Sequence, residues 1–438
     1  MQFTANPGGK LSGELRVPGD KSISHRSIML GSLAEGVTEV TGFLEGEDAL
    51  ATLNAFRAMG VSIDGPEGGR VTIHGVGLHG LQAPEGDLYV GNSGTSMRLL
   101  AGILAGQDFS TTMTGDESLS KRPMQRVADP LRLMGVDVQT GEGGRPPLTI
   151  NGNGRVTAIE YDLPMASAQV KSCVLLAGLY ADGVTTTHEP APTRDHTERM
   201  LKGFGYPVTV EGATASLQGG GKLTATRIDV PADISSAAFF MVAASIAPGS
   251  DITLRHVGIN PTRIGVINIL RQMGADIEVL DEREVGGEPV ADMRVRYAPL
   301  KGINIPEDQV PLAIDEFPSL FIAAACAEGT TVLTGAEELR VKESDRIQVM
   351  VDGLVSLGAD ARGTPDGAII TGRGNGAVAL GGGVINSHHD HRIAMSFAVA
   401  ALRASAPIAI EDCDNVATSF PNFVELARSA GIRLEVND

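Results

Sequence analysis

The sequence is poor in aromatic residues and contains no tryptophan. Aromatic side chains make up 4% of the 438 residues, whereas apolar side chains of all kinds make up 42%. A chain of this length is long enough for two or three domains, and its cores must be built chiefly from Ala, Val, Leu, Ile and Met. Glycine, with 55 copies, is well above its average share of about 7% and predicts many tight turns.

Cysteine is also scarce, with only Cys173, Cys326 and Cys413. Three residues without ligand spacing argue against a disulfide framework and against a zinc site. Cys173 and Cys326 lie inside apolar runs, so we expect buried, reduced thiols. The histidine-rich residues 388–391 are too local a cluster to indicate a metal site, and we expect no metal.

Net positive charge and long apolar runs are missing too. The net charge of −18 argues against a nucleic-acid or anionic-membrane partner, although it leaves room for a small basic pocket.

The first 19 residues lack the apolar core of a signal peptide. The longest apolar stretch, from Ala237, is shorter than the roughly 20 residues that span a bilayer. The chain contains no GxxxxGK[ST] loop, so the sequence does not indicate a Walker-type nucleotide site. We therefore expect a soluble, cytoplasmic protein.

A pattern of helix, turn and strand occurs six times along the chain. An apolar, helix-like run leads into a turn and a β-branched strand, with a glycine at the turn in four copies: Gly36, Gly183, Gly249 and Gly329. A second helix follows and ends in a glycine before a short strand. Those glycines are Gly60, Gly135, Gly205, Gly274, Gly358 and Gly431. Glycine suits the position after a helix because that position often needs positive φ.

The repeat predicts an α/β fold with two kinds of helix. The first helix of each copy is apolar on nearly all sides and should be central, whereas the second has one polar face and should lie outside. Six copies exceed one ordinary core, which favours two domains of three copies. A solenoid is the alternative, but the copies are longer than common solenoid repeats and their first helices begin with different polar residues.

Polar, often charged residues precede each apolar helix. The six clusters are Lys21, Ser22, His25 and Arg26; Asn92, Gly94, Thr95 and Arg98; Ser167, Gln169 and Lys171; Asp233, Ser235 and Ser236; Asp315 and Glu316; and Asp390, His391 and Arg392. A helix N-terminus offers unpaired N–H groups and a positive dipole end, which suit an anion such as phosphate. A single cluster is also explained by an N-cap with a solvated charge, but six at the same repeat position favour shared anion binding.

Further basic residues precede several of the second helices. They are Lys121, Arg122 and Arg126; Arg194; and Arg340, Lys342 and Arg346, the last group interleaved with Glu343 and Asp345. Ion-paired, solvated helix starts are the alternative for each segment. An acidic protein with so many anion donors at matching positions predicts a small, strongly anionic substrate.

Seven motifs together resemble one known family. They are DKSISHR, GNSGTSMR, SLSKRPM, SAQVKS, DEFPSL, RVKESDR and DHRIAMSFA. Through them the chain resembles the EPSP synthase family of enolpyruvyltransferases over nearly its full length. The resemblance implies an α/β fold of two domains, each with three βαβαββ-like repeats around buried helices. It places residues 1–19 and 233–438 in one domain and residues 20–232 in an inserted one, with the active site in an interdomain cleft that closes over its ligands.

The resemblance also implies a reaction. Family members transfer the enolpyruvyl group of phosphoenolpyruvate to the 5-hydroxyl of shikimate 3-phosphate. The products are 5-enolpyruvylshikimate 3-phosphate and phosphate, in the shikimate pathway to chorismate and the aromatic amino acids. It implies no cofactor, no metal, no nucleic-acid or membrane partner, and a monomer.

Residue roles follow from the same resemblance. Shikimate 3-phosphate would be bound by Lys21, Ser22, Arg26, Ser167, Ala168, Gln169, Arg194, Asp315 and Lys342. Phosphoenolpyruvate would be bound by Lys21, Gly94, Arg122, Gln169, Arg346 and Arg392, with His391, Asn92 and Thr95 as further candidates. Asp315 would be the base for the 5-hydroxyl, Glu343 the proton donor and acceptor at C3, and Lys21 and Lys342 would support the developing charge.

Two positions depart from part of the family. Ala168 stands where some members have a second phosphate-binding serine, and Thr418 where some have a lysine that reaches phosphoenolpyruvate. These departures leave the complete ligand set open.

Three alternatives compete with this interpretation, and the nearest shares its fold and its phosphoenolpyruvate chemistry. A sister enolpyruvyltransferase acts on UDP-N-acetylglucosamine, but its members carry a cysteine or aspartate in a mobile loop near residues 116–126. No cysteine occurs there, and the KSISHR motif favours the shikimate substrate. A non-catalytic repeat scaffold has no need for charge at the starts of buried helices. A nucleic-acid end-processing enzyme of related architecture is disfavoured by the net charge of −18.

Overall fold

The chain divides into two compact units. The structure, a computed structural model, describes residues 1–374 and 378–437. Unit 1 comprises Met1–Pro18, Pro231–Glu284 and Pro289–Asp438, and unit 2 comprises Gly19–Val230 with Val285–Glu288. The buried apolar side chains form two separate clusters, one drawn from each unit. Each unit therefore has its own hydrophobic core.

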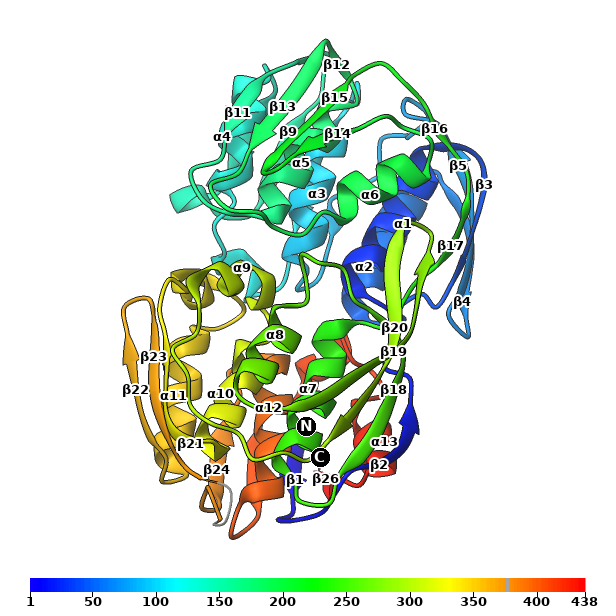
Figure 1. Ribbon diagram of the computed structural model, residues 1–438. Helices are drawn as coiled ribbons and strands as arrows, with labels where there is room; N and C mark the ends of the chain where they lie inside the picture. Colours follow the sequence, from blue (N-terminus) through cyan, green and yellow to red (C-terminus); the bar gives the residue numbers. More distant parts are fainter. Residues whose placement is uncertain (375–377, 438) are drawn as a thin grey trace. The chain divides into compact units, whose positions relative to one another are not determined.

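Unit 2 contains two sets of three helices. The first set is buried on nearly all sides: α1 (Lys21–Leu33), α3 (Gly94–Ala105) and α5 (Ala168–Gly178). The second set buries one face: α2 (Glu47–Ala58), α4 (Gln125–Leu133) and α6 (His196–Gly203). These helices are blue to green in Figure 1.

Three larger sheets accompany the helices of unit 2. Their strand orders are β16-β3-β5-β4 with β17 beside β3, β6-β7-β9-β8, and β11-β13-β15-β14, while β10 pairs with β12. The strands are β3 (Ala34–Thr41), β4 (Ser62–Glu67), β5 (Arg70–Val76), β6 (Leu88–Tyr89), β7 (Ser110–Thr114), β8 (Asp137–Thr140), β9 (Leu148–Asn151), β10 (Val156–Thr157), β11 (Glu160–Asp162), β12 (Ala181–Asp182), β13 (Val184–His188), β14 (Thr209–Glu211), β15 (Thr214–Gln218), β16 (Leu223–Thr224) and β17 (Arg227–Asp229).

Unit 1 repeats this division of helices. The buried set is α7 (Ile234–Ile246), α10 (Phe317–Cys326) and α12 (His391–Ala400), which pack against one another (Figure 1). The half-exposed set is α8 (Gly265–Gln272), α11 (Arg346–Ser356) and α13 (Phe423–Ala430), and α9 (Val310–Ala313) is one short turn. Every residue of α7 is buried, as its almost wholly apolar sequence predicts.

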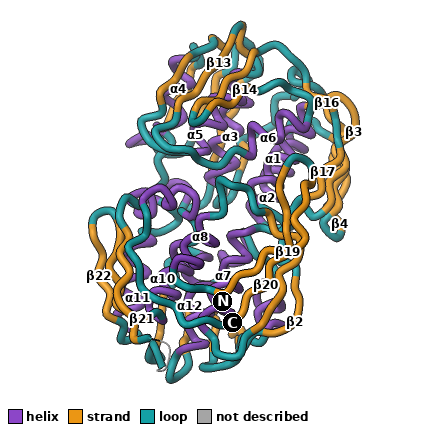
Figure 2. Tube along the Cα trace, in the orientation of Figure 1, coloured by secondary structure: helices purple, strands orange, loops and turns teal. Residues whose placement is uncertain are grey.

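Three sheets accompany the helices of unit 1, in the orders β19-β20-β18-β2, β21-β23-β22 and β24-β25-β1-β26. The strands are β1 (Gln2–Ala5), β2 (Ser12–Leu15), β18 (Asp251–Gly258), β19 (Asp276–Val285), β20 (Glu288–Arg296), β21 (Glu328–Leu333), β22 (Asp360–Thr364), β23 (Gly367–Arg373), β24 (Gly383–Asn386), β25 (Ile408–Glu411) and β26 (Leu434–Asn437). In Figure 2 the sheet of β21, β22 and β23 lies beside α10 and α11. Strand β23 contacts both helices, and β22 contacts α11.

The predicted repeat is confirmed in its details. The six glycines that follow the second helices all have positive φ, from 77° at Gly205 to 117° at Gly431. The four turn glycines do so as well, from 80° at Gly249 to 129° at Gly183. The predicted α/β class, with central apolar helices and half-exposed outer helices, is therefore confirmed, because three helix pairs and three larger sheets recur among the described residues of each unit.

The two ends of the chain meet in one sheet of unit 1. Strand β1 lies between β25 and β26, with Phe3 opposite Ile410 on one side and Val436 on the other. All three cysteines are buried and unpaired, as predicted. Among the described residues, no helix combines the length and apolar character needed to cross a bilayer.

Candidate active site

The buried helices of unit 2 begin side by side. In the first turns of α3 and α5, Gln169 Nε2 donates to Thr95 Oγ1 at 2.9 Å. Early in α1 and α5, Arg26 Nη2 donates to Ser172 Oγ at 3.0 Å. These contacts bring the starts of the three helices together, and with them their positive dipole ends. Asp20, Ser93 and Ser167 cap them, each accepting from a backbone N–H of the first turn.

We define the cationic cluster as the basic residues at this end of unit 2: Lys21, Arg26, Arg98, Arg122 and Arg194. Lys21 pairs with Asp48, which sequence reasoning does not single out. A Cβ on Gly94 would lie 3.4 Å from Nη1 of both Arg98 and Arg122, so this glycine lets two guanidinium groups approach the start of α3.

Arg122 and Arg98 are held by neighbouring polar groups. Arg122 Nη2 donates to Asn92 Oδ1 at 2.6 Å and to Ser118 Oγ at 3.2 Å. Arg98 donates to Gln169 Oε1 and, at 3.0 Å, to the carbonyl of Pro123. Asn92, Thr95 and Gln169, all predicted site residues, thus border the cationic cluster. The other predicted residues at or beside these helix starts are half-buried: Ser22, Ser167, Ala168 and Arg194.

Arg26 is more enclosed than the sequence suggests. Its Nε donates to Thr197 Oγ1 at 2.7 Å, and its Nη1 to the carbonyl of Ser22 at 3.0 Å. The pKa of its guanidinium is lowered to about 10, chiefly by burial and to a smaller extent by Arg194, while Glu198 opposes both. Arg26 therefore stays charged at neutral pH, and Arg194 is near enough to repel it.

Lys171, which the sequence grouping places among the anion donors at the helix starts, is instead buried and paired with carboxylates. Its side chain is 2% exposed and forms ion pairs with Glu189 at 2.9 Å and with Glu198 at 2.8 Å. That expectation is wrong because residues 189 and 198, remote in sequence, enclose the ammonium group.

The buried helices of unit 1 also begin side by side. Ser235 of α7 donates its hydroxyl to Glu316, the residue before α10. Arg263 Nη2 donates to the same hydroxyl at 2.7 Å and to Asp233, the cap of α7, at 3.1 Å. The starts of α10 and α12 are joined through Arg346, described next.

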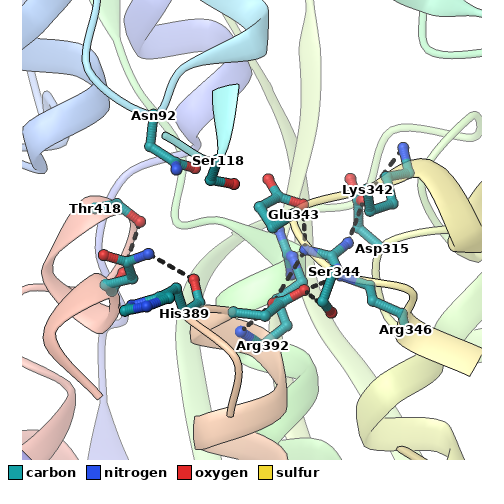
Figure 3. A network of polar contacts seen from close by, with 12 residues as sticks. Asn92, Ser118, Asp315, Lys342, Glu343, Ser344, Arg346, His389, Arg392 and Thr418 are labelled. Carbon is teal, nitrogen blue, oxygen red and sulfur yellow. Dashed lines mark hydrogen bonds and ion pairs between the residues drawn. The ribbon is translucent and has the colours of Figure 1, made fainter. Parts of the chain in front are cut away.

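Arg346, the first residue of α11, lies among three carboxylates (Figure 3). Its Nε contacts Asp390 at 2.9 Å, its Nη1 Asp315 at 3.2 Å, and its Nη2 Glu343 at 2.7 Å. We call Asp315, Glu343 and Asp390 the carboxylate cluster. Burial alone would lower the pKa of Arg346, but the three carboxylates outweigh it and raise that pKa. Burial would likewise raise the pKa of Asp390, yet Arg346 holds it below its usual value.

Asp390 also organises the start of α12. Its carboxylate accepts from the backbone N–H of Arg392 at 3.0 Å and from the Ser344 hydroxyl at 2.9 Å. The side chain of Arg392 is only 9% exposed, and its guanidinium has no partner among residues 1–374 and 378–437. A nearly buried cation without a protein partner is suited to an anionic ligand.

The remaining predicted residues of unit 1 lie around this cluster. Lys342 Nζ is 3.8 Å from Asp315 Oδ1, and His391 is buried in the first turn of α12. The hydroxyl of Thr418 donates to the carbonyl of Asn415 at 2.7 Å, so this residue supplies no cation here (Figure 3).

Sequence reasoning misses several contacts that set this geometry. Asp48, Ser172 and Thr197 hold Lys21 and Arg26, but nothing in their spacing indicates it. The N-cap position of Asp390 is a signal for its backbone role, although not for its pairing with Arg346. In the part of the chain that the structure describes, no three His, Cys, Asp or Glu side chains are grouped to hold a metal ion.

The fold is that of the enolpyruvyl transferases. The crystal structure of the enolpyruvyl transferase NikO from Streptomyces tendae matches with a TM-score of 0.80, covering 99% of this chain and 98% of its own, at 16% sequence identity. At that identity the likeness shows the fold alone.

Sequence comparison is more specific. The family model described as EPSP synthase (3-phosphoshikimate 1-carboxyvinyltransferase) matches residues 5–426. The 3-phosphoshikimate 1-carboxyvinyltransferase of Methylococcus capsulatus is 69% identical, over 99% of this chain and 98% of its own. That of Alkalilimnicola ehrlichii is 68% identical, over 100% and 97%. The structure of EPSP synthase from Acinetobacter baumannii has a TM-score of 0.89 at 64% identity, covering 100% of both chains. The chain belongs to the EPSP synthase family, which confirms the predicted resemblance.

Proposed function

We propose that the protein transfers the enolpyruvyl group of phosphoenolpyruvate to the 5-hydroxyl of shikimate 3-phosphate, releasing phosphate. Membership of the EPSP synthase family supports this function. The structural observation that carries it is Arg392, an unpartnered and nearly buried guanidinium beside Arg346 and the carboxylate cluster. Such a site combines anion binding with groups that can move protons, as this reaction requires.

Phosphoenolpyruvate would be bound chiefly by arginine. Arg122, Arg346 and Arg392 would neutralise its phosphate and carboxylate, and Lys21 would assist the phosphate. Gly94 leaves room for the ligand beside Arg98 and Arg122. Guanidinium groups fit both anions because they donate two parallel hydrogen bonds.

Shikimate 3-phosphate would be bound at the starts of α1, α5 and α6. Ser22, Ser167 and Arg194 would contact its phosphate. The buried guanidinium of Arg26 would add positive charge near the phosphate. Gln169, already bonded to both Thr95 and Arg98, would lie between the two substrates, and the backbone of Ala168 would add an N–H group at the helix start.

The acid–base steps would use the carboxylate cluster. Asp315 accepts the proton of the 5-hydroxyl as its oxygen bonds to C2 of phosphoenolpyruvate, while Glu343 donates a proton to C3. Glu343 then takes a proton back from C3 as phosphate leaves C2. Lys342, 3.8 Å from Asp315, and Lys21 support the charge that develops. Fixed cations near the leaving phosphate would supply much of the rate enhancement.

The domain and assembly predictions remain proposals as well. Residues 20–232 would form one three-repeat domain, and residues 1–19 with 233–438 the other. The separate core of each unit supports this division. We propose a cytoplasmic monomer, which size-exclusion chromatography with light scattering would test.

The test is phosphate release when both substrates are supplied. Arg392→Gln should reduce kcat/KM by about 100-fold or more, because a desolvated guanidinium–anion contact is lost. Arg362→Gln, an exposed arginine of β22, is the matched control and should leave the rate unchanged. Turnover with UDP-N-acetylglucosamine in place of shikimate 3-phosphate would contradict the proposal.

A further inference from the structure

The most enclosed lysine of unit 2, Lys171, takes no part in the proposed chemistry. Its side chain is 2% exposed, and the side chains of Glu189 and Glu198 are each 4% exposed. One ammonium group thus lies between two carboxylates in the interior. Glu198 Oε2 is buried and has no hydrogen-bond partner among the described residues.

Such an arrangement does not favour stability. Burial of charged groups is costly, and well-packed apolar residues at the same place are often as stable or more so. An unsatisfied buried carboxylate oxygen adds to that cost. Since stability does not explain these three charged residues, their function is better explained by the neighbouring groups that they position.

The three residues lie next to the groups that hold Arg26. Lys171 precedes Ser172 on α5, and Glu198 follows Thr197 on α6. Ser172 and Thr197 share a hydrogen bond of 2.7 Å, and both contact the guanidinium of Arg26. The Lys171–Glu198 ion pair thus joins the same two helices one residue away from the hydroxyls that fix Arg26.

Glu189 holds the other side of the same segment. The hydroxyl of Thr193 donates to Glu189, and Thr193 directly precedes Arg194. Lys171 therefore contacts one carboxylate before Arg194 in the chain and one after it. Both ends of the segment 189–198 therefore form ion pairs with the ammonium group of Lys171.

We propose that Lys171 is a positioning residue for shikimate 3-phosphate: through Glu189 and Glu198 it fixes the segment that carries Arg194 and keeps Thr197 in contact with Arg26. This inference rests on the proposed function, in which Arg194 contacts the phosphate of that substrate and Arg26 supplies positive charge. It extends that function by naming a residue that touches no substrate.

Steady-state kinetics with each substrate varied in turn test the inference. Lys171→Met should raise KM for shikimate 3-phosphate about tenfold or more, as expected for one displaced charge-assisted hydrogen bond. KM for phosphoenolpyruvate and kcat should change by less than about threefold, a difference of under 1 kcal/mol. Thr197→Val should change the same constant in the same direction. In the double variant, the increase in KM for shikimate 3-phosphate should be smaller than the product of the two single increases, because both substitutions displace Arg26.

The matched control is Thr187→Val, which removes another buried threonine hydroxyl of unit 2, bonded to the carbonyl of Ala215. It should leave both KM values unchanged. A folded Lys171→Met protein with a lower melting temperature but a normal KM for shikimate 3-phosphate would overturn the inference. If Lys171→Met does not fold, Thr193→Val replaces it, and an unchanged KM in that variant overturns the inference equally. Absence of turnover in the wild-type protein would count against the proposed function instead.

Discussion

Asp390 shows how much one buried carboxylate can organise. It caps α12, accepts from Ser344 and pairs with Arg346, while its own side chain is fully buried. Two helix starts thus depend on a single charge. The arrangement keeps Arg346 and Arg392, both proposed ligands of phosphoenolpyruvate, at adjoining places in unit 1.

Asp390→Asn tests that dependence. Asparagine can still cap the helix, so the substitution removes only the negative charge that pairs with Arg346. Breaking a buried ion pair should lower the free energy of unfolding by about 3 kcal/mol, measured by urea denaturation. Asp251→Asn, which removes an exposed pair with Arg294, should cost much less.

The same pair predicts a pH dependence. Because the pKa of Asp390 is lowered in the folded state, its contribution is complete above the unfolded value of about 3.9. It is lost as the pH falls through the lower folded value. The difference in stability between wild type and Asp390→Asn should therefore be constant near neutral pH and shrink below about pH 4. A difference that persists unchanged into stronger acid would contradict this account.

At the scale of helices and strands, much of the structure is readable from the sequence. Apolar runs such as the one from Ala237 become fully buried helices, and the glycine after each second helix has positive φ. Both are local effects of composition and backbone freedom. The placement of Arg26 is not local, since its Nε partner, Thr197, lies 171 residues away, and no periodicity indicates such a pairing. The same holds for Lys171 and its two glutamates.

Helix α6 offers a direct test of the glycine rule. Gly205 has φ of +77° and a side chain added there would meet no close neighbour, so Gly205→Ala should cost about 1–2 kcal/mol through backbone strain alone. Gly203, the last residue of the same helix, also has open space but lacks positive φ. Gly203→Ala should instead stabilise by about 0.5–1 kcal/mol. Equal effects of the two substitutions in urea denaturation would contradict the argument.

At the scale of the whole molecule, two cores imply two cooperative regions. Leu100 is buried in the core of unit 2 and Leu270 in that of unit 1, each with no exposed surface. A protein of this kind is not expected to unfold in one all-or-none step.

Leu100→Ala and Leu270→Ala should each weaken one region. Removal of a buried leucine side chain costs about 2–5 kcal/mol, and calorimetry should show one of two thermal transitions displaced in each variant. The displaced transition should differ between the two. A single transition that moves equally in both proteins would show that the cores unfold together.

The sheet that joins both chain ends has a consequence for biosynthesis. Strand β1 precedes its neighbours β25 and β26 by most of the length of this chain. Residues 19–230 are complete long before those neighbours and can collapse while synthesis continues. This sheet can therefore close only after the intervening residues, including those of unit 2, have been synthesised.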